Sequence, residues 1–239
     1  MAPRVILIRH AQALHNVDNK SHLASIHDPP LSDLGAEQCV ALRQSLRDRL
    51  DGPSLNPSEI AIIASPMRRT LQTAQLATDW LTERGVKIVA DASWQENSAK
   101  PCDTGSPITA MKAEFPDVDF ETVDPVWPDK TTPAGGRYAY TRTAILARGK
   151  RCIEELSHRP EKLVLVISHS GFLRVGMTGY WWMNADYRIF DFEHAASGEL
   201  RLRQDESTLS GGLGLSWKDP VELGSDLPEE DPDASTDQP

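Results

Sequence analysis

The chain of 239 residues has little cysteine and no long hydrophobic run. Cys39, Cys102 and Cys152 are widely spaced and form neither a C-x-x-C pair nor a zinc-ligand pattern, so we expect free thiols in a reducing compartment. No apolar stretch approaches the ~20 residues that a membrane-spanning helix needs. These absences exclude a disulfide-stapled secreted domain and a helical membrane protein.

Positive charge is also scarce. The formal net charge is -10, from 25 Lys and Arg against 35 Asp and Glu, so the surface as a whole repels nucleic acid and anionic lipid. We therefore expect neither nucleic acid nor a membrane as a partner. Any phosphate-binding site would need arginines concentrated in one place.

The two ends of the chain lead to two further expectations. Met1 to Arg4 lead directly into the apolar run at 5–8, which is too short for the core of a signal peptide, so we expect a cytoplasmic protein. After Lys218 there is no Lys or Arg, and Asp, Glu, Pro, Ser and Thr dominate. Residues 219–239 are therefore expected to form an acidic disordered tail.

Short apolar runs alternate with helical patterns over residues 1–218, which we expect to form one domain. The runs are candidate buried strands at 5–8, 60–64, 86–89 and 163–167. Apolar residues recur at helical spacing over 39–50, 71–81 and 138–156, with Ser32 as a candidate N-cap of the first helix. This alternation predicts a three-layer, doubly wound α/β fold, with a mostly parallel sheet and helices on both faces.

Two other segments depart from the alternating pattern. Residues 188–192 and 200–203 are predicted to form a terminal hairpin. Residues 91–136 are rich in Pro, Asp and Thr, and a segment of that length inside a domain is usually a lid or a substrate-binding insertion.

Histidines and arginines follow three of the predicted strands. Arg9 and His10 come after the first strand, Arg68 and Arg69 after the second, and His169 after the strand at 163–167. In a doubly wound sheet, ligands bind outside the carboxyl ends of the strands. Arginine offers a planar set of donors that matches phosphate oxygens, so the pattern predicts a phosphate site at this edge.

Together with other motifs, these segments resemble the histidine phosphatase superfamily, in its phosphoglycerate mutase-like branch. The matching segments are Leu7 to Asn16, Leu31 to Gln38, Ser65 to Ala74, Trp94 to Glu96, and Ser168 to Gly171. They span residues 5 to about 175 in the family's order. The resemblance implies the phosphoglycerate mutase-like fold.

The resemblance also implies roles for individual residues. His10 is similar to the phosphorylated nucleophile, and Glu96 falls where many members carry the proton donor, with Asp103 as the alternative donor. The implied phosphate-binding residues are Arg9, Asn16, Arg69, His169 and Ser170.

The implied chemistry needs no metal or cofactor. A neutral His10 imidazole would attack phosphorus, and a protonated His169 would help the arginines to stabilise the phosphoryl oxygens. Glu96 would protonate the leaving oxygen and then deprotonate the attacking water. The expected substrate is a small-molecule phosphate ester, although a phosphoprotein stays open, and the oligomeric state is not predicted.

Four departures from the family pattern bear on the activity. Ala11 and Ser170 stand where glycines are common, which indicates an adjusted pocket. Residues 135–137 lack the Gly-Glu-Ser stretch of many relatives, and the extended basic stretch of phosphoglycerate mutases is missing. A phosphatase is therefore favoured over a phosphoglycerate mutase-type isomerase or a non-catalytic phosphate-binding regulatory protein.

Several other residues keep two interpretations. Three arginines are expected in surface or structural salt bridges rather than at the ligand: Arg68, Arg148 and Arg174. Three histidines could line the entrance to the site or be solvated loop residues: His15, His22 and His27. Trp181 and Trp182 are expected to fill the core, and Trp127 is the better candidate for a substrate pocket.

Overall fold

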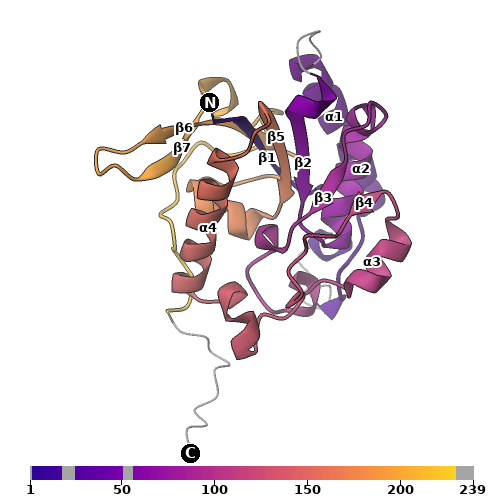
Figure 1. The fold of residues 1–239 in the computed structure, drawn as a ribbon, viewed down its shortest axis with the longest axis vertical. Coiled ribbons are helices and arrows are strands. Elements are labelled where there is room, and N and C mark those ends of the chain that lie inside the picture. Colours follow the sequence, from indigo (N-terminus) through magenta and orange to yellow (C-terminus); the bar gives the residue numbers. More distant parts are fainter. Residues whose placement is uncertain (1, 18–24, 51–55, 230–239) are drawn as a thin grey trace, which may run out of the picture.

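The computed structural model of the chain describes residues 2–17, 25–50 and 56–229. Within these residues, seven strands form one sheet in the order β4-β3-β2-β5-β1-β6-β7 (Figure 1). The strands are β1 (Arg4–Arg9), β2 (Ile60–Ala64), β3 (Ile88–Ala90), β4 (Val118–Asp119), β5 (Leu163–Ser168), β6 (Tyr187–His194) and β7 (Leu200–Gln204). The pairs from β4 to β1 are parallel, whereas β6 is antiparallel to both β1 and β7.

Helices cover both faces of the sheet. They are α1 (Asp33–Leu50), α2 (Arg68–Thr82), α3 (Ile108–Glu114), α4 (Arg142–Ser157) and the π-helix η7 (Phe172–Thr178). Figure 1 shows α1, α2 and α3 on one side of the sheet and α4 on the other. The predicted three-layer α/β fold is confirmed.

The apolar runs become strands because the sheet buries both of their faces. All five residues of β2 and all six of β5 are buried. Along β1, Ile6 and Ile8 join the apolar cluster under α1 and α2, while Val5 and Leu7 join the cluster under α4 and η7. A parallel sheet covered on both faces needs such continuous apolar strands.

The other predicted elements are found within a few residues of their expected ends. The β6–β7 hairpin is present, and α4 corresponds to the helix expected over 138–156. Ser32 caps α1, since its Oγ accepts the Gly35 N–H at 3.1 Å.

The segment 91–136 contains more regular structure than its composition suggests. It contains η4 (Ala92–Trp94), η5 (Pro101–Asp103), α3, β4 and part of η6 (Pro133–Tyr138). β4 pairs with the edge of β3, and Met111 and Phe115 lie in the core cluster beneath α1 and α2. Part of the expected lid is therefore integral to the main domain.

The expectation of disorder from residue 219 onward is wrong for residues 219–229. The Arg142 N–H donates to the Pro228 carbonyl at 2.7 Å, the Gly224 N–H donates to the Val175 carbonyl at 2.8 Å, and Leu227 packs against the cluster under α4. These contacts hold the segment along α4 and η7 despite its acidic composition. Residues 230–239 lie outside the described residues.

None of the described helices is long and apolar enough to cross a membrane.

Candidate active site

The site lies at the carboxyl ends of three adjacent parallel strands. His10 follows β1, His169 follows β5, and Arg69 lies in the first turn of α2, just after β2. The rings of His10 and His169 are 5.2 Å apart between centroids. The Arg69 and His169 residues are fully buried and His10 is 2% exposed, so the chain brings the predicted residues together in a desolvated place.

Arg69 contacts both histidines. Its Nε donates to His10 Nε2 at 3.2 Å, and its Nη2 lies 3.0 Å from His169 Nδ1. Nη1 donates to the Cys102 carbonyl at 2.6 Å, and Nη2 also lies 3.3 Å from Asp103 Oδ1. By contrast, Arg68 points away and pairs with Glu114. The structure thus brings Arg69, and not Arg68, to the histidines.

The contacts of His10 define its tautomer. A guanidinium can only donate, so Nε2 accepts from Arg69, and Nδ1 must carry the proton that it donates to the Ala11 carbonyl at 2.7 Å. Burial, followed by the charges of Arg69 and Arg9, holds the pKa of His10 well below its ordinary value. His10 is therefore a neutral imidazole with its lone pair on Nε2.

His169 is neutral for the same reason. Its Nδ1 accepts from Arg69, so Nε2 carries the proton and donates to Ser65 Oγ at 3.0 Å. Burial and the Arg69 charge lower the pKa of His169 well below its ordinary value. The protonated His169 expected from the sequence would therefore require Arg69 Nη2 to give up its contact with His169 Nδ1.

Arg9 lies beside this group with part of its guanidinium unused. Its Nη1 donates to the Trp182 carbonyl at 2.7 Å, whereas its Nε is buried with no partner among the described residues. Burial lowers the pKa of Arg9 to about 10, so the side chain stays charged at neutral pH. A buried guanidinium with a free donor suits an anionic ligand.

The side chains of Asn16 and Ser170 hydrogen-bond to backbone groups outside the cluster of His10, His169 and Arg69. Asn16 Oδ1 accepts the Ala13 N–H at 3.2 Å and closes the short helix η1 (Leu14–Asn16). Ser170 Oγ lies 3.5 Å from the Trp182 carbonyl. Ser170 directly follows His169 and Asn16 lies six positions after His10, but neither side chain hydrogen-bonds the two imidazoles or Arg69 among the described residues.

Glu96 occupies the start of η7. Its Oε1 accepts the N–H groups of Asn97 at 2.9 Å and Phe172 at 3.0 Å, and its Oε2 accepts the Gly171 N–H at 3.1 Å. A Cβ at position 171 would lie 2.5 Å from Oε1, so glycine is what allows this approach. Two of the three donors, the Gly171 and Phe172 N–H groups, lie at the start of η7, so the carboxylate caps that helix.

Lys130 holds the loop that carries Glu96 and Asp103. Its Nζ donates to the carbonyls of Glu96 at 2.7 Å, Ser98 at 2.8 Å and Asp103 at 2.6 Å, and the residue is only 3% exposed. Burial lowers the pKa of Lys130 to about 7. Nothing in the sequence indicated this role, because Lys130 lies in the segment without recognisable motifs.

Arg148 and Arg174, the two remaining arginines considered from the sequence, have different surroundings. Arg148 is buried, donates to Asn97 Oδ1 at 2.8 Å and lies over the Phe172 ring at 4.0 Å, so it is structural. Arg174 forms no ion pair within the described ranges, and it lines a hollow of about 190 Å³ with Glu96 and Asp103. The expected salt bridge of Arg174 is therefore not seen there.

The tryptophans mostly fill the core. Trp182 is fully buried, as expected. Trp127, the expected pocket residue, is 7% exposed, donates its Nε1–H to the Ser106 carbonyl at 3.0 Å and packs in a small apolar cluster. The structure assigns Trp127 to the core because its polar group is satisfied internally. Trp181 stacks on Trp217 with 4.7 Å between ring centroids.

His15, His22 and His27, the three histidines expected near the entrance to the site, differ in position. The ring of His15 lies 5.9 Å from that of His10 between centroids. His27 is exposed, and His22 lies outside the described residues. Only His15, of the two that are described, adjoins the site.

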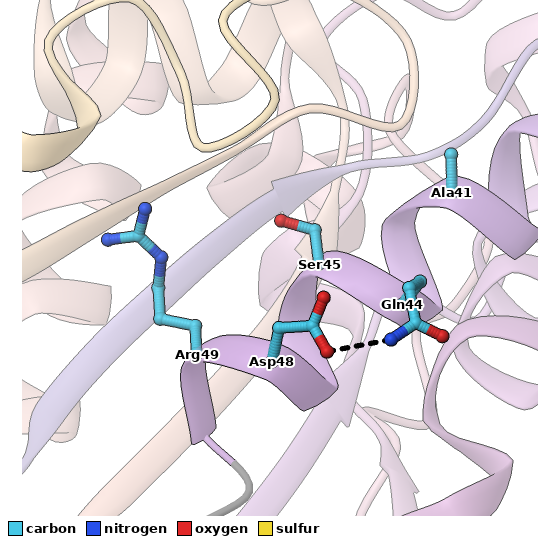
Figure 2. A pocket seen from close by; sticks show the side chains of 5 residues that line it. All are labelled: Ala41, Gln44, Ser45, Asp48 and Arg49. Atoms are coloured by element: carbon cyan, nitrogen blue, oxygen red, sulfur yellow. Dashed lines mark hydrogen bonds between the residues drawn. The ribbon is translucent and has the colours of Figure 1, made fainter.

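A larger hollow is lined by residues of α1 and by none of the candidate site residues. It is lined by Ala41, Gln44, Ser45, Asp48 and Arg49 (Figure 2). Gln44 donates to Asp48 at 2.7 Å, and no residue of the candidate site contributes. Among the residues that the structure describes, no three His, Cys, Asp or Glu side chains gather as a metal-binding group.

Comparison with known proteins places this geometry in a family. The model of the histidine phosphatase superfamily (branch 1) matches residues 5–211, and the chain belongs to that superfamily. Phosphoglycerate mutase-like protein 1 of Arabidopsis thaliana is 29% identical over 71% of this chain and 68% of its own length. A second phosphoglycerate mutase-like protein of that plant is 31% identical over 70% of each chain.

The solved structures agree on the fold. The ecdysone phosphate phosphatase from Bombix mori, solved with tungstate, aligns with a TM-score of 0.56 at 16% identity, covering 85% of this chain and 92% of that one. At that identity the likeness concerns the fold alone. The architecture is the phosphoglycerate mutase-like α/β fold of the superfamily.

Proposed function

We propose that this protein is a metal-independent phosphatase that hydrolyses phosphate monoesters through a phosphohistidine on His10. The observation that carries the proposal is the state of His10, a neutral imidazole whose Nε2 lone pair faces the Arg69 guanidinium. Such a nitrogen is a competent nucleophile, and the adjacent cation attracts the phosphoryl group that it would attack. The substrate we propose is a small-molecule phosphate ester.

In the first step Nε2 of His10 forms a bond to phosphorus while the ester P–O bond breaks. Arg69 already aims Nε and Nη2 donors at the two imidazoles, and phosphoryl oxygens would take the place of those acceptors. The unused Nε of Arg9 would add a further donor. A bound dianion would in turn favour protonation of His169, whose Nδ1 would then donate to the phosphoryl group.

The second step transfers the phosphoryl group from His10 to water. The N–P bond breaks as the new P–O bond forms, and Arg69 and Arg9 stabilise the same oxygens as before. Glu96, with Asp103 as the alternative, would protonate the leaving oxygen and then deprotonate the attacking water, and both carboxylates line one hollow of about 190 Å³.

The direct test is the phosphoenzyme itself. Wild-type protein incubated with p-nitrophenyl phosphate and quenched in denaturant should contain an acid-labile, base-stable phosphohistidine, and the His10→Ala variant should contain none and lose turnover. His158→Ala, at an exposed position, is the matched control. Undiminished hydrolysis by His10→Ala would refute the mechanism.

A phosphoglycerate mutase-type isomerase is the second candidate, because both plant relatives are named phosphoglycerate mutase-like. The chemistry at His10 would be the same, with a substrate hydroxyl replacing water. Phosphorus NMR of 3-phosphoglycerate incubated with the protein separates the two, since inorganic phosphate indicates hydrolysis and a new ester signal indicates isomerisation.

A further inference from the structure

A small hollow adjoins the candidate active site. It is lined by both candidate proton donors, Glu96 and Asp103, and by residues 225–227 of the C-terminal segment. Its volume of about 190 Å³ is below the roughly 300–1,000 Å³ of most ligand pockets, so it admits only a small group. Because Glu96 or Asp103 would protonate the leaving oxygen of the ester, this hollow is where the leaving group would lie.

Three side chains that line the hollow have hydrogen-bond donors without partners. They are Arg174 of η7, Tyr140 just before α4, and Ser225 of the C-terminal segment. Arg174 Nε and Ser225 Oγ are buried with no partner within residues 2–17, 25–50 and 56–229. Over the same ranges the Tyr140 hydroxyl forms no hydrogen bond and Arg174 forms no ion pair. An unpaired buried donor is costly, so donors that converge on one hollow indicate a ligand that supplies the acceptors.

The donors define the chemistry of that ligand. A guanidinium only donates, and its planar set of N–H groups matches a carboxylate or a phosphate, while the hydroxyls of tyrosine and serine donate as well. The charge of Arg174 also reaches the phosphate site, since it contributes, after burial and the charge of Arg69, to the lowered pKa of Arg9. The hollow and the phosphate site thus share one positive field, which suits a molecule with two anionic groups.

The carboxyl groups around the hollow leave the charge of Arg174 without a partner. Glu96 accepts backbone N–H groups at the start of η7, and Asp103 lies 3.3 Å from Arg69. Asp226 is exposed to solvent. None of the three forms an ion pair with Arg174 among the described residues, so its guanidinium is available to an incoming anion.

We propose that the leaving group of the substrate carries a second oxyanion, a carboxylate or a further phosphate, which Arg174, Tyr140 and Ser225 bind in this hollow. The inference rests on the proposed phosphatase function and names a substrate class for it. Arg174 supplies the charge, and the two hydroxyls complete the set of donors. These three residues determine specificity, whereas the chemistry stays at His10.

The C-terminal segment is held in place on both sides of Ser225. The Gly224 N–H donates to the Val175 carbonyl at 2.8 Å, and the Arg142 N–H donates to the Pro228 carbonyl at 2.7 Å. This segment lies beyond residue 211, where the match to the superfamily ends. One of the three donors therefore comes from a part of the chain outside the matched domain.

Matched esters test the second oxyanion. Carboxyalkyl phosphates and alkanediol bisphosphates of increasing chain length are compared with alkyl phosphates of the same length. A hydrogen bond to a charged group is strong enough that the wild type should prefer at least one ester with a second oxyanion by about tenfold or more in kcat/KM. A preference for the carboxylates alone identifies a carboxylate as the ligand, and a preference for the bisphosphates alone identifies a phosphate.

Variants test the three donors. Arg174→Met should remove the preference by raising KM for the esters with a second oxyanion, and its loss for alkyl phosphates should be at least about tenfold smaller. Tyr140→Phe and Ser225→Ala each remove one hydroxyl and should reduce the preference by about two- to tenfold. Ser225→Ala should not lower Tm, because the buried hydroxyl that it removes has no partner among the described residues. Arg201→Met, at an exposed position of β7, is the matched control and should keep the preference.

Equal kcat/KM for the matched esters in the wild type at every chain length would overturn the inference, and so would equal losses for both kinds of ester in Arg174→Met. Circular dichroism of each variant ensures that folded protein is compared. Phospho-His10 formed from p-nitrophenyl phosphate, which has no second oxyanion, reports on the proposed function independently of the hollow. Its absence in the wild type would refute that function, so the two failures are distinguishable.

Discussion

Replacing Glu96 by glutamine tests whether this carboxylate caps η7. The amide keeps one oxygen, which can still accept two of the three N–H bonds, but its NH₂ group must face the third N–H, that of Gly171. The variant loses one charge-assisted hydrogen bond and the negative charge at the helix start. A hydrogen bond to a charged group contributes about 1.5–3 kcal/mol, so we expect a loss of about 2 kcal/mol in the free energy of unfolding.

For a domain of this size, 1 kcal/mol corresponds to about 2–4 °C in Tm, so the midpoint should fall by about 4–8 °C. Thermal unfolding followed by circular dichroism measures the shift, and urea titration gives the free energy. Glu114→Gln is the matched control, because Glu114 pairs with Arg68 at the surface and should contribute less than about 1 kcal/mol. A Tm of Glu96→Gln within about 1 °C of the wild type would refute the cap.

Three further outcomes follow from the packing and from the buried ionisable groups. Gly149→Ala would place a Cβ 1.8 Å from the Gly176 carbonyl oxygen, so α4 and η7 must separate, and urea titration should show a loss of about 1–3 kcal/mol in the free energy of unfolding. Gly136→Ala, with open space around its Cβ, is its control. Because the pKa of Lys130 is about 7 in the folded protein, Lys130 binds fewer protons there than in the unfolded chain between pH 7 and about 10. The free energy of unfolding should therefore rise over this range by up to about 1.4 kcal/mol per pH unit. Urea titration of Lys130→Met should lack that rise. Since the pKa of His10 is lowered by burial, kcat/KM should show no loss attributable to its protonation near pH 6.5, and a stopped assay from pH 5 to 8 measures this.

The sequence predicted the parts of the fold that depend on continuous burial. Each apolar run became a strand because both faces of a parallel sheet are covered, and the ends of β1, β2 and β5 brought His10, Arg69 and His169 to one edge as expected. Family spacing pointed to Arg69 rather than Arg68, and Arg69 is the arginine that contacts both histidines. These features follow from local pattern and from the geometry that all doubly wound sheets share.

What the sequence did not predict depends on contacts between distant segments. The Glu96 carboxylate and the backbone of η7 are about 75 positions apart, and Lys130 reaches three carbonyls more than 25 positions away. The segment 219–229 is ordered by backbone bonds to α4 and η7 that its acidic composition does not indicate. Such contacts decide which polar groups are already satisfied, and hence which remain available for chemistry.

The hydrogen bonds of Arg69 explain the charge states of the two histidines in the candidate site. Arg69 is fully buried, and its donors are satisfied by two neutral imidazoles, a carbonyl and Asp103. The imidazoles must be neutral to accept these bonds, so the same contacts that hold the arginine also keep His10 in the state that the proposed function needs. A phosphoryl group competes only for donors, since its oxygens can replace the imidazole nitrogens as acceptors and free the Nε2 lone pair to attack. The arrangement of the two imidazoles therefore rests on one buried guanidinium rather than on net positive charge.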